Sequence, residues 1–175
     1  MPHHVTVRPR RPDDVDGLVA LLAGQQAQSR YPLRWPLPFP VEDFLVRETE
    51  ERAWVAEVDG AVAGHVAVAR LDRELAVEFA RLRPGEEPAA VTVLFTGAGH
   101  RGRGVGGALH DTAVAAIRGS GRLPVLDVLP GHSTAVEMYR HRGWTEIGRA
   151  RPGWLPAGQP DVLLMVLPEP VGRAT

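Results

Sequence analysis

The sequence predicts an α/β (α+β) fold with a mixed, partly antiparallel central sheet flanked by helices. In the first half of the chain, two apolar runs at residues 54–58 and 61–68 are separated by Asp59-Gly60. Asp-Gly between apolar runs predicts an antiparallel hairpin. In the second half, a strand, a helix and a strand follow one another over residues 91–128. That order is typical of the crossover that joins two parallel strands.

The composition narrows the class of protein. The chain has 175 residues and a net charge of −1, which fits one domain over residues 1–170 with a loose tail at 171–175. The near-neutral charge predicts no nucleic-acid partner. No apolar run reaches membrane-spanning length and no secretory signal is visible, so we expect a cytoplasmic protein with no membrane partner, as a monomer or homodimer. The chain has no cysteine, which excludes a thiol nucleophile, and no lysine.

The first half of the chain begins with a strand at residues 5–8 and a helix that starts at Pro12. The apolar stripe of this helix consists of Val15, Leu18, Val19 and Leu22. Four prolines in residues 31–40 predict a stiff loop, which carries Tyr31, Trp35 and Phe39. We expect a short helix around residues 42–49 before the hairpin. Residues 72–89 are charged and contain Pro84-Gly85, which we interpret as a strand end and an exposed excursion.

The second half continues with an apolar strand at residues 91–95, a glycine-rich turn at 97–107 and an amphipathic helix from Val105 to about Ile117. A further strand is expected at 123–128. Ser133 is a candidate N-cap for a short helix that ends at Gly143. Residues 144–150 and 161–167 are expected to form closing strands.

The glycine-rich turn predicts a phosphate site. Glycines let the backbone approach a ligand closely, and a helix N-terminus together with Arg101 and Arg103 favours an anion. The series Gly102-x-Gly104-x-x-Gly107, with Asp127 twenty residues later, also matches the dinucleotide fingerprint. An NAD-dependent oxidoreductase is therefore an alternative. It is disfavoured because about 90 residues precede the turn, whereas the fingerprint normally follows the first strand of its domain.

Two motifs resemble the GNAT superfamily of N-acetyltransferases. Arg101-Gly102-Arg103-Gly104-Val105-Gly106 is similar to the Arg/Gln-x-x-Gly-x-Gly/Ala loop of that family, and Leu94-Phe95-Thr96 falls where its preceding strand ends. Ala135-x-x-Met138-Tyr139-x-x-x-Gly143-Trp144 resembles the later Ala-x-x-Leu-Tyr-x-x-x-Gly-Phe segment. Together the motifs cover residues 90–147.

The resemblance implies a splay between two parallel strands, here residues 91–95 and 125–128, with acetyl-CoA as co-substrate. The seven histidines show no metal-binding spacing, so we expect no metal. The backbone of Leu94, Phe95 and Thr96 would hold the pantetheine arm. The pyrophosphate would lie on Arg101, Gly102, Arg103, Gly104, Val105, Gly106 and Gly107. The family's usual asparagine before the last helix is absent, so His132 or Ser133 would make that contact. Ala98 stands where the family often has proline.

The resemblance also implies acetyl transfer to an amine of a small molecule or peptide, by direct attack with both substrates bound. Tyr139 would be the general acid, although it also lies on the apolar stripe of its helix. Glu78 and Asp127 are the candidate bases. Tyr31, Trp35 and Phe39 are candidates for the wall of the acceptor site. A non-catalytic module that senses acetyl-CoA remains an alternative.

Overall fold

The computed structural model describes residues 3–170. The expected tail at 171–175 lies outside the described residues. The strands are β1 (Val5–Pro9), β2 (Glu50–Val58), β3 (Ala61–Ala69), β4 (Pro88–Thr96), β5 (Leu123–Val128), β6 (Thr145–Ala150) and β7 (Val162–Val166). The helices are α1 (Val15–Ser29), α2 (Val41–Leu45), α3 (Arg73–Leu82), α4 (Val105–Gly119) and α5 (Ser133–His141), with 3-10 turns at Pro12–Asp14 and Ala98–His100.

The strands form one seven-stranded sheet in the order β1-β2-β3-β4-β5-β7-β6. Every neighbouring pair is antiparallel except β4 and β5. The predicted hairpin is β2–β3, and the predicted crossover runs from β4 through α4 to β5. The mixed, partly antiparallel sheet is confirmed. It is unlike the mostly parallel doubly wound sheet that the dinucleotide alternative requires.

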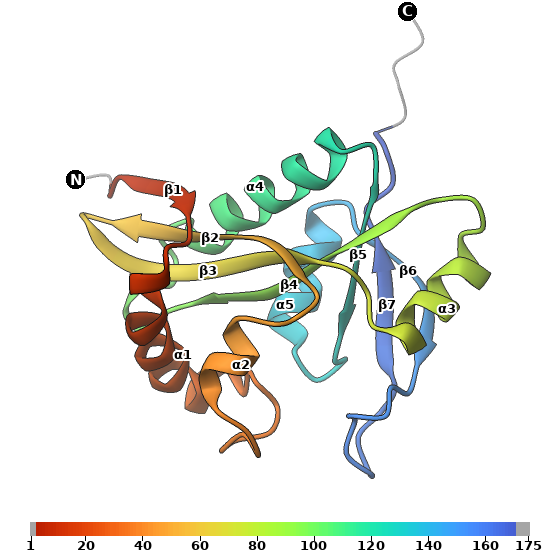
Figure 1. The fold of residues 1–175 in the computed structure, drawn as a ribbon, viewed down its shortest axis with the longest axis horizontal. Helices are drawn as coiled ribbons and strands as arrows, with labels where there is room; N and C mark the ends of the chain where they lie inside the picture. The colour runs from red at the N-terminus through yellow and green to blue at the C-terminus, as the bar shows by residue number, and fades with distance from the viewer. Residues whose placement is uncertain (1–2, 171–175) are drawn as a thin grey trace, which may run out of the picture.

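The parallel pair separates soon after it begins. Only three residue pairs join the two strands, Pro88 with Leu123, Ala89 with Pro124 and Ala90 with Val125. Beyond them β4 runs on beside β3 while β5 turns away, as Figure 1 shows. We call this opening the seam. It confirms the predicted splay between the two parallel strands.

A β-bulge shapes the β4 side of the seam. Opposite β3, two residues of β4 stand where one is expected, and Val93 has a φ of 49°. A bulge turns neighbouring side chains to the same face. Val91 therefore packs toward α4, whereas Val93 packs toward α1 and α2. His65 on β3 secures this geometry, because its Nδ1–H donates to the Val93 carbonyl at 2.8 Å.

Two layers of helices cover the sheet. One face packs on α4 and α5 in the largest apolar cluster, which includes Leu109, Ile117 and Val136. On the other face, α1 and α2 pack with Val93 and Phe95, and α3 packs with β5, β6 and β7. The seam therefore lies between two layers of helices, where side chains from both faces can reach it.

The sequence-based interpretation of residues 72–89 as a strand end and an exposed excursion is wrong. Ten of them form helix α3, and the strand residues among them are Pro88 and Ala89 at the start of β4. The Asp72 carboxylate caps the helix by accepting from the Leu75 amide at 2.9 Å. Leu75 and Phe79, one helical turn apart, are buried against the sheet. The short helix expected around 42–49 is also shorter than expected and ends at Leu45, because β2 begins at Glu50.

Candidate active site

The glycine-rich turn presents free backbone donors at one end of the seam. Gly102 and Gly104 adopt positive φ angles of 73° and 80°, which glycine adopts without a steric cost. Gly104 is the N-cap of α4 and supplies no side-chain hydrogen bond. The first amides of α4, from Val105 to Gly107, therefore point out of the helix without a helical partner. Arg101 and Arg103 are exposed beside them. This arrangement suits a phosphate group.

The glycines of the turn also set how closely α4 approaches its neighbours. A Cβ on Gly106 would stand 3.5 Å from the Thr96 hydroxyl, and one on Gly107 would collide with the Arg142 guanidinium. Arg142 is fixed there by the Asp111 carboxylate at 2.6 Å. Gly106 thus lies beside the end of β4, and Gly107 leaves room for the Arg142 guanidinium. The amide donors of the turn therefore adjoin the free edge of β4. This arrangement fits acetyl-CoA, which has both phosphates and an extended arm.

The strand edge itself comes from Leu94, Phe95 and Thr96. These residues lie on β4 past the last pair with β5, while their other edge pairs with β3 through Phe95–His65 and Thr96–Gly64. The edge facing the seam is therefore free to bind an extended ligand arm like an added strand.

Asp127 lies on β5 on the seam side of the last β4–β5 pair. Its carboxyl group is held in a poorly solvated place, and this burial raises its pKa to about 6. The Arg47 charge lowers the pKa and the Asp72 charge raises it. None of the ion pairs found within residues 3–170 involves Asp127. A carboxylate with this pKa is ionised at neutral pH and still accepts a proton readily.

Tyr139 reaches the seam from α5. Burial raises the pKa of its hydroxyl above the ordinary value, and the charge of Asp127 adds to the effect. The phenol is therefore protonated at neutral pH. Its ring is buried and packs edge-on against Trp144, with centroids 5.7 Å apart. Its ring is in the core, and its charge environment includes Asp127 and Tyr31.

A buried histidine supports the ring of Tyr139 from behind. His110 on α4 lies 6.2 Å from Tyr139 between ring centroids. Its Nε2 accepts from the Trp144 indole N–H at 2.8 Å, and its Nδ1 lies 2.8 Å from the Asp111 carboxylate. Because an indole nitrogen only donates, the proton of the neutral imidazole must sit on Nδ1. Burial lowers the pKa of His110, in agreement with a neutral ring.

Of the three loop aromatics, Tyr31 is the one placed at the seam. Burial raises the pKa of its hydroxyl to about 12, with opposing effects from Arg47 and Asp127 and a backbone hydrogen bond with Val93. It packs edge-on against Phe44 and His132. Trp35 is partly buried, and Phe39 is 46% exposed. No aromatic contact joins either of them to Tyr31 among the described residues.

His132 and Ser133 stand at the start of α5. The structure makes His132, and not Ser133, the N-cap residue. The His132 Nε2–H donates to the Arg30 carbonyl at 3.1 Å and so ties α5 to the end of α1. Burial lowers the pKa of the imidazole. Ser133 is exposed, so its hydroxyl is available to a ligand.

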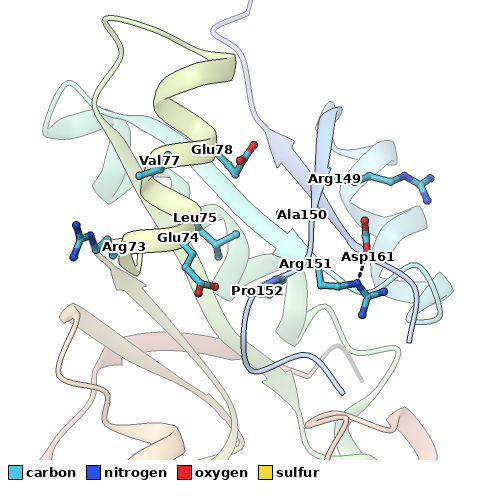
Figure 2. A pocket seen from close by; sticks show the side chains of 10 residues that line it. All are labelled: Arg73, Glu74, Leu75, Val77, Glu78, Arg149, Ala150, Arg151, Pro152 and Asp161. Atoms are coloured by element: carbon cyan, nitrogen blue, oxygen red, sulfur yellow. Dashed lines mark ion pairs between the residues drawn. The ribbon is translucent and has the colours of Figure 1, made fainter. Parts of the chain in front are cut away.

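Glu78 is on α3, not on a strand. Its carboxylate pairs with Arg81 at 2.9 Å and lines an open groove of about 580 Å³ between α3, the end of β6 and the loop that follows. Figure 2 shows Glu78 pointing toward β6, and Arg151 joined to Asp161 on the far side of the groove. Asp127 and Tyr139 do not line this groove. The structure therefore brings Asp127 and Tyr139 to the seam and leaves Glu78 elsewhere.

Arg47 is a site residue that the sequence did not indicate. It lies after α2, its Nη1–H donates to the Thr92 hydroxyl at 3.2 Å, and its guanidinium stacks on Phe44 at 4.6 Å. Its proximity to the seam depends on the folding of distant segments, and nothing in the local sequence marks it.

Two further properties concern residues 3–170 only. No three His, Asp or Glu side chains in this range are grouped so that they could hold a metal ion. None of the helices in this range is long and apolar enough to cross a bilayer.

Comparisons with solved structures give the class of this fold. A putative acetyltransferase from Salmonella typhimurium, solved with its cofactor acetyl-CoA, has a TM-score of 0.70 and 14% identity, over 98% of each chain. The histone acetyltransferase HPA2 and related acetyltransferase from Corynebacterium glutamicum has a TM-score of 0.69 and 21% identity, over 99% of this chain and 100% of that one. A spermidine N-acetyltransferase chimera from Vibrio cholerae and hSSAT has a TM-score of 0.67 and 18% identity, over 93% and 94%.

The fold is thus that of an acetyltransferase with a splayed sheet. No curated protein matches the chain. The sequence model of the acetyltransferase (GNAT) family matches residues 20–144, well over half of the chain. The protein belongs to this family of acetyltransferases, which use acetyl-CoA.

Proposed function

We propose that this acetyltransferase moves the acetyl group of acetyl-CoA to an amine, with both substrates bound in the seam. The observation that carries the proposal is the pair of titratable groups there. Asp127 from β5 is ionised near neutral pH, whereas Tyr139 from α5 stays protonated. Two groups held in opposite protonation states are suited to one base and one acid.

Bound acetyl-CoA supplies an acetyl thioester. Its pyrophosphate is assigned to the amides of the turn at Gly104–Gly107 with Arg101 and Arg103, and its extended arm to the free edge at Leu94–Thr96. The exposed Ser133 hydroxyl is a further candidate contact. Holding two reactants together can contribute about 7–11 kcal/mol to lowering a barrier, so these contacts carry much of the rate enhancement.

The chain contains no cysteine, and the proposal needs no covalent enzyme intermediate. The Asp127 carboxylate takes a proton from the acceptor ammonium, directly or through one water. The freed nitrogen forms a bond to the acetyl carbon as the carbon–sulfur bond breaks. The Tyr139 hydroxyl donates its proton to the departing sulfur. The new amide nitrogen then loses its second proton through water, which restores the Tyr139 hydroxyl, and Asp127 releases its proton to solvent.

The coenzyme assignment is tested by thermal unfolding. Acetyl-CoA is expected to raise the melting temperature, and NAD is not. Gly104→Asp should abolish the shift, because it places bulk and a negative charge at a residue with a φ of 80° where the phosphates approach. Gly85→Asp is a matched control, since Gly85 has a φ of 83° in an exposed turn away from the seam. A larger shift with NAD than with acetyl-CoA would contradict the assignment.

The acid role is tested with Tyr139→Phe. This variant keeps the ring that packs on Trp144, so its melting temperature and its affinity for acetyl-CoA should change little. Turnover in a thiol-release assay should fall by about 10²–10⁴-fold, the contribution typical of a positioned general acid. Turnover at the wild-type rate would show that Tyr139 only packs. Binding of acetyl-CoA without turnover of any amine would favour the sensor alternative.

A further inference from the structure

A fixed cation and a carboxylate face each other across the seam without forming an ion pair. The Arg47 guanidinium is held at two points, by the Phe44 carbonyl at Nε and by the Thr92 hydroxyl at Nη1, both at 3.2 Å. It also lies over the Phe44 ring at 4.6 Å. A guanidinium has five N–H donors. Its Nη2 makes no hydrogen bond within residues 3–170, so the N–H donors on that nitrogen are free to bind a ligand.

The strand register sets Asp127 opposite this cation. The three pairs of β4 and β5 share an offset of 35 residues, as in Pro88 with Leu123. Continued past the last pair, this offset assigns Thr92 and Asp127 to the same level, on the two sides of the opening. Asp127 follows Val125 by two residues and so shares its face of β5, the face that α1, α2 and α3 cover. Thr92 lies on that face too, because Arg47 reaches it from α2. Arg47 and Asp127 therefore border the same opening from its two sides.

The electrostatics agree with this geometry. The positive charge of Arg47 lowers the pKa of both Asp127 and Tyr31, so all three groups share one local field. Asp72, the other carboxylate that Asp127 senses, is engaged as the cap of α3. Two opposite charges that are partly desolvated and unpaired cost free energy. A ligand with one negative and one positive group would pair with both of them.

We propose that the acceptor is a free α-amino acid, with its amine at Asp127 and its carboxylate on Arg47. This inference rests on the proposed function. An α-amino acid carries its two charges on one carbon, which matches a cation and a carboxylate that border the same opening. The edge-on pair of Tyr31 and Phe44 offers an apolar wall for the side chain. A polyamine would bring a second positive charge to Arg47, and a peptide N-terminus would offer it a neutral carbonyl.

The first experiment compares matched acceptors in a thiol-release assay with acetyl-CoA. The panel consists of the common amino acids, their amides, the corresponding decarboxylated amines, spermidine and short peptides. We expect kcat/KM for the favoured amino acid to exceed that of its amide and its amine by about 10- to 100-fold. Equal turnover of the amide or amine, or a preference for spermidine or a peptide, would overturn the inference and leave the acetyltransferase function standing. No turnover of any amine, with acetyl-CoA bound, would overturn both.

The second experiment compares Arg47→Gln with Arg52→Gln. Arg52 also stacks on an aromatic ring, at 4.8 Å from the Trp54 centroid, but on an exposed part of β2. The assay is run at pH 8.5, where Asp127 is ionised even though loss of the Arg47 charge raises its pKa. Under these conditions Arg47→Gln should raise KM for the amino acid about 10- to 100-fold with kcat nearly unchanged, and leave KM for the decarboxylated amine as it was. Arg52→Gln should change neither constant. An equal change for both substrates in Arg47→Gln would assign Arg47 a structural role and overturn the inference.

A third variant covers the case in which Arg47→Gln does not fold. Arg47→Lys keeps the charge and loses the planar fork. It is expected to raise KM for the amino acid by a smaller factor, again without changing KM for the decarboxylated amine. If Arg47→Lys raises KM by the same factor for both substrates, Arg47 acts on the fold and not on a carboxylate, and the inference is overturned.

Discussion

Replacing His65 by phenylalanine tests how the bulge beside the seam is held. His65 is fully buried on β3, where it donates to the Val93 carbonyl and accepts from Arg10 Nη1 at 3.1 Å. Arg10 remains paired with Glu50 at 2.6 Å in the variant, but the Val93 carbonyl loses its partner. An unsatisfied buried group costs about 1–3 kcal/mol, so His65→Phe should lose that much stability at pH 7.5.

The same histidine makes stability depend on pH. Burial lowers the pKa of His65 to about 4, and its unfolded value is near 6.5. Between these values the unfolded chain binds more protons, so the contribution is fully present above pH 6.5 and is lost as pH falls toward 4. At about 1.36 kcal/mol for each pH unit, the wild type should lose about 2.5 kcal/mol between pH 7.5 and 4.5 from this group alone. His65→Phe lacks this loss, so the stability gap between the two proteins should nearly close at pH 4.5.

The assay is denaturant unfolding of both proteins at the two pH values. Val66→Ala is the control, since it removes methyl groups from a buried neighbour that does not titrate. Its stability gap from the wild type should be the same at both pH values. A gap for His65→Phe that stays equally wide at pH 4.5 would show that His65 is not held neutral, and the account of the bulge would be wrong.

Two further predictions concern the seam and its support. The pH profile of kcat/KM should rise through about pH 6 as Asp127 loses its proton, and Asp127→Asn should flatten this limb and lower turnover by about 10²–10⁴-fold. An unchanged limb in Asp127→Asn, measured with an acceptor amine of low pKa, would exclude Asp127 as the base. Trp144→Phe removes the indole donor to His110 and should cost about 1 kcal/mol in unfolding experiments, and it should raise the pKa of His110 as followed by NMR. An unchanged His110 titration would mean that the indole bond does not hold the neutral ring.

Much of the fold could be predicted from local sequence signals. Asp59-Gly60 marked the β2–β3 hairpin, and the glycines at 102–107 marked the start of α4. Helix α3 was missed because its four charged residues and the following Pro84-Gly85 drew attention away from the spacing of Leu75 and Phe79. The capping residue Asp72 and that one-turn spacing were the available signals.

The bulge could not be predicted in this way. The alternation of Val91, Val93 and Phe95 predicts that all three side chains share one face. The structure places Val91 on one face and the other two on the opposite face, because an extra residue in β4 shifts the alternation. The site residue Arg47 was missed for a related reason. Its place depends on a contact with Thr92, 45 residues away, which no local pattern encodes.

The three-pair ladder between β4 and β5 has a thermodynamic consequence for the whole chain. A sheet that stops pairing in its middle gives up cross-strand hydrogen bonds that a closed sheet would have, so the ligand-free protein is less stable than its strand count suggests. A ligand that pairs with the free edge of β4 restores part of that ladder and binds only the folded state. By mass action, each tenfold rise of such a ligand above its Kd adds about 1.4 kcal/mol to the free energy of unfolding. The cellular supply of that ligand would then help to set how long each copy of this protein survives.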